Sequence, residues 1–210
     1  MADFTKTLEE VKKNSKQRQF KQTIDLIVNL QQMEFSKAEN RFTEEVVLDT
    51  GKGKDIKIGV IGDDLAIKTK NLAHVVINEM RLDGFEKNKK DLKQITKSCD
   101  FFIADPKLML KVGKVMGRVL GPKGKMPKPV PPQMDPTPLI NKLKKTVKVR
   151  LTGSPTIQVP IGTEDMSSDQ IGKNVEAVLH ALEKKLPNGK NNIKEVLVKT
   201  TMGKPIKVAY

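Results

Sequence analysis

The feature that most constrains the fold is an alternation of short apolar strands and helical stretches in the middle of the chain. The segment DIKIGVIGDD (55–64) is a mostly apolar strand that ends in a Gly-Asp turn, and the strands HVVI (74–77) and CDFFIAD (99–105) follow it. Helical patterns separate these strands, from Asp64 onward and again around Asp91 to Lys97. Strands that alternate with helices form parallel βαβ units, so we expect an open, Rossmann-like α/β sheet here.

The N-terminal region has a different pattern. We expect a short helix over residues 4–13 and a second helix capped by Ser15. The second helix would have one apolar face, at i, i+4, i+7 and i+8, made by Phe20, Ile24, Ile27 and Val28. The segment RFTEEVVLDT (41–50) reads as a strand, and the glycine-rich TGKG closes it.

The C-terminal region returns to this helix-and-strand pattern. Strands are expected at VKVRL (147–151) and TIQVPI (156–161), and again within IKEVLVKTTMGKPIKVA (193–209), where a turn separates two of them. Ser167 and Gln170 have the spacing of a capping box ahead of a long amphipathic helix that stops before Pro187.

These patterns predict an α/β protein with two domains. Residues 1–51 and 146–210 would form one discontinuous α+β domain, because both ends of the chain share the same character. Residues 52–145 would form an α/β domain inserted into it.

The charge of the chain is large and uneven. The net charge is +14, and between Pro106 and Arg150 there are twelve Lys or Arg residues and a single acid, Asp135. Asp105 and Pro106 can begin a helix that has an apolar stripe on one side. A second, basic stripe would face outward, made by Lys107, Lys111, Lys114 and Arg118. Such a surplus indicates a polyanionic partner, above all a nucleic acid.

The sequence lacks the residues that common enzyme mechanisms need. The only histidines are His74 and His180 and the only thiol is Cys99, so a Cys/His zinc site cannot be built. The loop that contains Gly124 and Lys125 is not a phosphate-binding P-loop, because Val119 occupies its first glycine position and Met126 its hydroxyl position. We expect no catalytic residue, no metal and no cofactor. The alternative that stays open is a nucleotide-using α/β enzyme acting on RNA.

Membrane and secretory classes are also disfavoured. No apolar run approaches the roughly 18 residues of a membrane-spanning helix, the N-terminus has no signal-peptide pattern, and one cysteine forms no intramolecular disulfide. We therefore expect a cytoplasmic protein without a membrane partner. Tryptophan is absent and there is one tyrosine, so base stacking on aromatic side chains is disfavoured. Recognition of folded RNA through its backbone and shape fits better.

Four motifs occur in a distinctive order along the chain: RFTEE (41–45), GRVLGPKGKMPKP (117–129), VPIGT (159–163) and KTTMGKP (199–205). Together they closely resemble the ribosomal protein L-one family, the protein of the mobile lateral stalk of the large ribosomal subunit. The TTMGKP and GPKGKMPKP segments are more similar to archaeal members than to bacterial ones.

The resemblance implies a two-domain protein, monomeric when free, that binds large-subunit ribosomal RNA chiefly through the discontinuous domain. It also implies help in releasing tRNA from the exit site and repression of translation of the protein's own messenger. The residues expected to bind ribosomal or messenger RNA are Arg41, Phe42, Thr43, Glu44, Arg150, Lys199, Thr200, Thr201, Met202 and Gly203. A secondary, salt-sensitive contact with RNA or tRNA is expected at Lys107, Lys111, Lys114, Arg118, Lys123, Lys125 and Lys128.

Overall fold

A computed structural model of the chain describes residues 4–33, 40–69 and 72–208. The chain divides into two compact units, which are described separately. The discontinuous unit consists of Met1–Lys54 and Lys145–Tyr210, and the inserted unit consists of Asp55–Lys144. Among the described residues, no helix is both long and apolar enough to cross a membrane.

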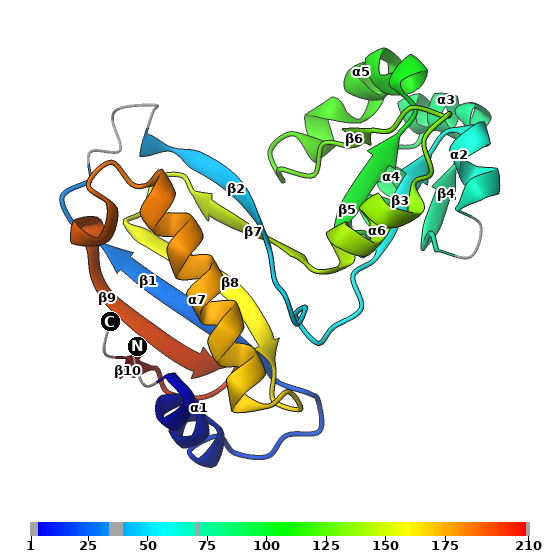
Figure 1. Cartoon of the computed structure of the whole chain (residues 1–210). Helices are drawn as coiled ribbons and strands as arrows, with labels where there is room; N and C mark the ends of the chain where they lie inside the picture. The colour runs from blue at the N-terminus through cyan, green and yellow to red at the C-terminus, as the bar shows by residue number, and fades with distance from the viewer. Residues whose placement is uncertain (1–3, 34–39, 70–71, 209–210) are drawn as a thin grey trace. The chain divides into compact units, whose positions relative to one another are not determined.

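The discontinuous unit has helices on one face of an antiparallel sheet (Figure 1). The sheet has the strand order β10-β9-β1-β8, and a separate two-stranded ribbon pairs β2 with β7. Its helices are α1 (Phe4–Lys13) and α7 (Ser168–Lys185). Its strands are β1 (Thr23–Leu30), β2 (Phe42–Val47), β7 (Thr146–Leu151), β8 (Thr156–Thr163), β9 (Ile193–Thr200) and β10 (Ile206–Val208), with the short 3₁₀ helix η3 (Gly189–Asn192) before β9.

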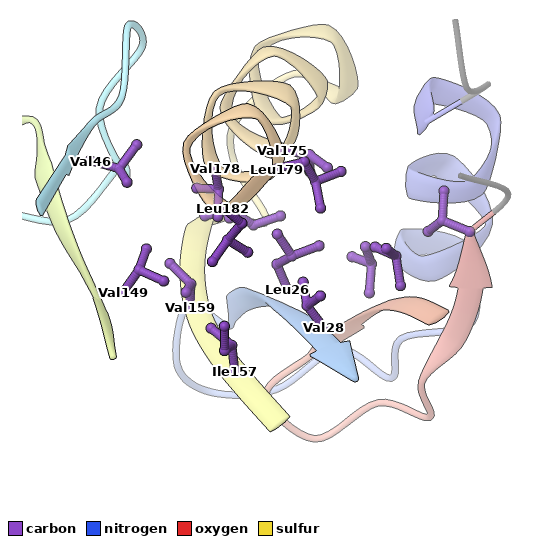
Figure 2. Packing of buried hydrophobic residues seen from close by; sticks show 14 of the residues in the cluster. Leu26, Val28, Val46, Val149, Ile157, Val159, Val175, Val178, Leu179 and Leu182 are labelled. Atoms are coloured by element: carbon purple, nitrogen blue, oxygen red, sulfur yellow. The ribbon is translucent and has the colours of Figure 1, made fainter. Parts of the chain in front are cut away.

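Burial of apolar side chains between the helices and the sheet forms the core of this unit. Side chains of α7 point toward those of β1 and β8 (Figure 2). The helix begins as expected: the Ser167 hydroxyl accepts from the Gln170 N–H at 3.2 Å, and the Gln170 side chain accepts from the Ser167 N–H at 3.2 Å. Such a box satisfies backbone donors that the first turn of a helix leaves unpaired.

The second helix expected after Ser15 is wrong, because residues 23–30 form the strand β1. Burial alternates along β1, with Ile24, Leu26, Val28 and Leu30 buried and the residues between them half-buried. The helical spacing found in the sequence left out Leu26 and Leu30, which reveal the true period of two. Pairing with β8 on one side and β9 on the other makes β1 a central strand.

The inserted unit is an open parallel sheet with helices on both faces, as the sequence predicts. The strand order is β4-β3-β5-β6. Its strands are β3 (Ile58–Ile61), β4 (Val75–Ile77), β5 (Phe101–Ala104) and β6 (Lys128–Pro129). Its helices are α2 (Asp63–Lys68), α3 (Glu79–Lys87), α4 (Lys89–Ser98), the 3₁₀ helix η2 (Pro106–Leu108), α5 (Met109–Leu120) and α6 (Thr137–Lys144). Helices α3, α4 and α5 share one core cluster with the sheet, and α2 and α6 share the other.

Candidate nucleic-acid interface

The turn after β9 is joined to the start of β1. The Thr201 N–H donates to the Thr23 carbonyl at 2.9 Å, and the Thr201 hydroxyl accepts from the Thr23 N–H at 3.0 Å. Thr200 is buried, whereas Met202 is 61% exposed. A Cβ atom on Gly203 would lie 2.3 Å from the Thr200 hydroxyl oxygen, so the turn needs glycine there. The turn therefore has Thr200 in the interior and Met202 on the surface.

The loop between α1 and β1 packs beside this turn and is held by one buried side chain. Gln22 is 1% exposed, and its amide nitrogen donates to the Ser15 hydroxyl at 2.9 Å and to the Lys16 carbonyl at 3.0 Å. Its amide oxygen accepts from the Met202 N–H at 3.2 Å. Because one amide contacts both segments, the loop and the turn form a single ordered surface, which we call the turn end (residues 14–22 and 200–205).

A hollow of about 660 Å³ is lined by the turn end together with Glu10 of α1 and Ile206 of β10. Its cationic lining residues are Lys16, Arg18 and Lys204, and Glu10 is the carboxylate among them. Apolar atoms of Met202, Pro205 and Ile206 and the backbone of Gly203 complete the lining, together with Asn14. Phe20, in the same loop, is 50% exposed. The turn end thus combines positive charge with exposed apolar surface.

Carboxylates lie beside the turn end. The Gln22 N–H donates to Glu164 Oε1 at 3.0 Å, and Lys21 Nζ lies 2.7 Å from Asp165 Oδ2. The hydrogen bond from Asp165 raises the pKa of the exposed Lys21 ammonium. On the neighbouring strands Asp25 is paired in register with Lys199, and burial raises the pKa of the Asp25 carboxyl while the charge of Lys199 opposes that rise. Lys199 therefore has a carboxylate beside it within the sheet.

The structure does not bring residues 41–44 to this turn. Phe42 pairs with Leu151 and Thr43 with Arg150 at the start of β2, and Phe42 packs against the core. That end of β7 adjoins the hairpin whose Pro155 carbonyl accepts from the Leu30 N–H. Thr200, in contrast, pairs with Ile24 at the beginning of β1. Ile24 and Leu30 are six residue steps apart on β1, which corresponds to about 20 Å. Arg41 to Glu44 and Arg150 therefore lie at the opposite end of the sheet, where β2 begins (Figure 1).

Glu44 also has a structural partner at that opposite end. Its carboxylate oxygen Oε2 lies 3.2 Å from Nζ of Lys185, which is in the last turn of α7. The ion pair links the β2–β7 ribbon to the helix that covers the main sheet. A contact of this kind is explained by packing of the unit without any RNA.

The basic residues expected at a secondary contact fall into different environments in the inserted unit. Lys111 on α5 lies 3.0 Å from Glu79 and 2.7 Å from Asp83, both on α3. These hydrogen bonds, first that to Asp83, raise the pKa of the Lys111 ammonium. Lys125 donates to the Thr96 carbonyl at 3.0 Å and to the Cys99 carbonyl at 2.5 Å, at the end of α4. Both side chains hold elements of the unit together.

The other members of that set are more accessible. Lys107, Lys114, Arg118 and Lys123 are exposed, and Lys128 is half-buried in β6. The GPKGK segment closes α5: Gly124 has a φ of 61°, and the Lys125 N–H donates to the Leu120 carbonyl at 3.0 Å. A left-handed glycine and a bond back to the last turn are typical of a helix C-terminus. Among the described residues, no His, Cys, Asp or Glu cluster could hold a metal ion.

The chain as a whole is similar to known proteins. The model of the ribosomal protein L1p/L10e family matches residues 11–204. The chain belongs to this family. A family of ribosomal proteins is structural, so the protein is not an enzyme, and the interpretation as a nucleotide-using enzyme is wrong.

Relatives of this L1p/L10e chain match it over nearly its whole length. Large ribosomal subunit protein uL1 of Methanothermobacter thermautotrophicus is 43% identical over 208 residues, 98% of each chain. The protein of the same name from Thermoplasma volcanium is 42% identical over 207 residues, 98% of this chain and 95% of the relative. That from Thermococcus kodakarensis is 44% identical over 207 residues, 98% and 96% of the two chains. These sources are archaeal, in agreement with the sequence motifs.

Sequence reasoning missed part of the turn end of this L1p/L10e protein. The helical pattern predicted from Ser15 onward included Lys16, Arg18 and Phe20, and it would have buried Phe20. The available signal was the polar segment SKQRQ, which has no apolar position to place on a helix face. The partners that order this loop lie up to 185 residues away, so no local pattern contains them.

Proposed function

We propose that this protein is a structural constituent of the large ribosomal subunit in the cytoplasm and binds large-subunit ribosomal RNA with the turn end. Its membership of a ribosomal-protein family supports the ribosomal role. The observation that carries the choice of surface is the hollow where exposed Met202 lies among Lys16, Arg18 and Lys204.

The chemistry of the turn end suits folded RNA. Lysine and arginine neutralise phosphates, and this contact positions the RNA without reading its sequence. Met202 and Phe20 are exposed and offer apolar contacts to sugars or unstacked bases. Since Gln22 orders the loop and the turn before RNA arrives, little conformational entropy is lost on binding.

A carboxylate in the hollow supplies selectivity. Glu10 lines it beside Lys16 and Arg18. A carboxylate repels phosphate but accepts hydrogen bonds from base amino groups or from 2′-hydroxyls. An RNA that places such a donor at Glu10 and its phosphates at the cations is therefore preferred over a generic polyanion.

Two finer roles follow from the family resemblance. We propose that the protein assists release of tRNA from the exit site, with Lys107, Lys114, Arg118 and Lys123 of the inserted unit contributing non-specific phosphate contacts. We propose also that a segment of its own messenger binds the turn end and that translation is thereby repressed. The free protein would act as a monomer in both roles.

Binding of purified protein to two RNAs at one salt concentration tests the central proposal. One RNA is the stalk segment of large-subunit ribosomal RNA, and the other is an unrelated duplex of equal length. The stalk RNA is expected to bind at least about a thousandfold more tightly, the lower range of specific over non-specific nucleic-acid binding. Equal affinities would contradict the proposal.

A further inference from the structure

Helices α4 and α5 of the inserted unit cover the same face of its sheet. Leu92 and Ile95 of α4 belong to one buried cluster with Val112 and Met116 of α5, and Phe102 of the sheet belongs to it too. Side chains on the opposite side of each helix therefore point away from the sheet, toward the same side of the unit. This outward side is where a partner could contact both helices.

Four cations lie on that outward side. Each lies two residues from a buried apolar residue of the same helix, and a separation of two residues corresponds to a rotation of about 200° around the helix axis. They are Lys90 (beside Leu92), Lys97 (beside Ile95), Lys114 (beside Val112) and Arg118 (beside Met116), and all four are exposed. We call them the outer basic face. It combines two lysines of α4 with Lys114 and Arg118, two members of the basic stripe.

These cations differ in their surroundings from Lys111 and Lys125 of the same unit. Lys111 is bound by Glu79 and Asp83, and Lys125 is bound by carbonyl groups at the end of α4. Within the part of the chain that the structure describes, no carboxylate or carbonyl group pairs with a side chain of the outer basic face. Asp91, the acid of α4, accepts from the Asn88 side chain at 2.6 Å.

The spacing of the charges suits a dense, extended polyanion. Lys90 and Lys97 are about 10 Å apart along α4, and Lys114 and Arg118 are about 6 Å apart along α5. The axes of packed helices are about 8–10 Å apart. The four positive charges therefore lie within a patch that is shorter than one helical turn of a nucleic-acid duplex. A nucleic-acid duplex carries about one phosphate charge per 1.7 Å of its axis.

The residues around this face indicate which form of nucleic acid it takes. The phenylalanines of the inserted unit, Phe85, Phe101 and Phe102, are all buried. An unstacked base would find no aromatic ring on which to stack. In an RNA double helix, by contrast, the phosphates are accessible without any unstacking, and recognition depends on shape and backbone.

We propose that the outer basic face of α4 and α5 binds the phosphate backbone of a double-helical RNA segment without reading its sequence. This rests on the proposed role of the protein as an RNA-binding ribosomal constituent, and it assigns the secondary contact to a surface made by two helices. Lys111 and Lys125 take no part in it, because they stabilise the unit.

The test compares two full-length variants with the same change in net charge. One has K90Q, K97Q, K114Q and R118Q, and the matched control has K57Q, K173Q, K184Q and K194Q, all at exposed lysines elsewhere. Binding to a fully paired RNA duplex without loops is measured over a range of salt concentrations. The slope of the logarithm of the RNA affinity against the logarithm of the salt concentration is compared between the two variants. It should be shallower in the first variant than in the control by about 0.9 for each phosphate that the first variant no longer neutralises.

Slopes that are the same for both variants would overturn the proposal. Weakened binding to vesicles of anionic lipid in the first variant, with an unchanged RNA slope, would assign the face to a membrane surface and would also overturn it. Affinity for the stalk RNA at the turn end is measured in parallel. A normal stalk affinity with an unchanged duplex slope would refute this inference alone and leave the ribosomal RNA proposal standing.

Discussion

The hydroxyl oxygens of Ser15 and Thr200 lie 3.1 Å apart, although 185 residues separate them in the chain. This contact, with the bonds of Gln22 around it, joins the N-terminal loop to the turn after β9. The proposed RNA surface is therefore a tertiary structure assembled from both ends of the chain. Its geometry depends on the buried polar side chains of Gln22 and Thr200.

Replacing Gln22 by leucine should damage both stability and binding. The change removes hydrogen bonds to Ser15, Lys16 and Met202 and leaves their groups without these partners, at a cost of about 1–3 kcal/mol in the free energy of unfolding. Stalk RNA affinity should fall at least about fivefold, because the loop and the turn lose their link. Urea unfolding and RNA titration measure the two effects. Gln158→Leu, at an exposed site on β8, is the control and should change stability by less than about 0.5 kcal/mol.

Met202→Asp should weaken stalk RNA binding by about 1–3 kcal/mol. The variant removes an apolar side chain from the interface and places a carboxylate near phosphates. Met134→Asp is matched, because Met134 is 64% exposed and Met202 61%, and it should leave the stalk affinity unchanged. Filter binding at fixed salt is sufficient. Equal losses of affinity for both variants would remove Met202 from the interface.

Gly203→Ala and Gly84→Ala should change stability in opposite directions. A Cβ at Gly203 would lie 2.3 Å from the Thr200 hydroxyl oxygen, so the turn must shift and the protein should lose about 1–3 kcal/mol. A Cβ at Gly84, inside α3, meets no atom within 4 Å, and alanine should stabilise that helix by about 0.5–1 kcal/mol. Chemical unfolding of each variant tests this, and a stable Gly203→Ala protein would contradict the geometry of the turn.

Lys123 and Lys125 lie in one loop, but replacing each by methionine should have different effects on the stability of the protein. Lys125→Met removes the donor that holds the end of α4 and should lower stability by about 1–3 kcal/mol, with little change in the salt dependence of RNA binding. Lys123→Met should leave stability within about 0.5 kcal/mol, because the side chain is exposed. If the salt slope changed for Lys125→Met and not for Lys123→Met, the structural role given to Lys125 would be wrong.

Local patterns in the sequence predicted the elements that local physics determines. The capping box at Ser167 and the Asp105–Pro106 start before α5 depend on neighbours within a few residues, and both are present in the structure. The strands β3 and β5 are recognisable because both of their faces are buried. Helix α3 was missed as a separate element, since Gly84 interrupts its helical pattern.

The candidate site was less accessible to prediction, because its residues are brought together only by the fold. Phe20 fitted a helix face in the sequence, yet pairing of β1 with β8 and β9 makes the following residues a strand and leaves Phe20 in the loop. Lys111 and Lys125 counted as part of a basic surface until their partners on other helices were known. A charge pattern shows which residues are cationic, but only the structure shows which of them are already bound.

The most direct measurement compares two arginines at opposite ends of the same sheet. Arg18 lines the hollow of the turn end, and Arg150 pairs with Thr43 at the far end. Arg18→Gln and Arg150→Gln change the net charge equally, so general electrostatics cannot separate them. We predict that the dissociation constant for stalk RNA rises at least about fivefold in Arg18→Gln and stays unchanged in Arg150→Gln. A rise in Arg150→Gln with none in Arg18→Gln would contradict the placement of the RNA at the turn end.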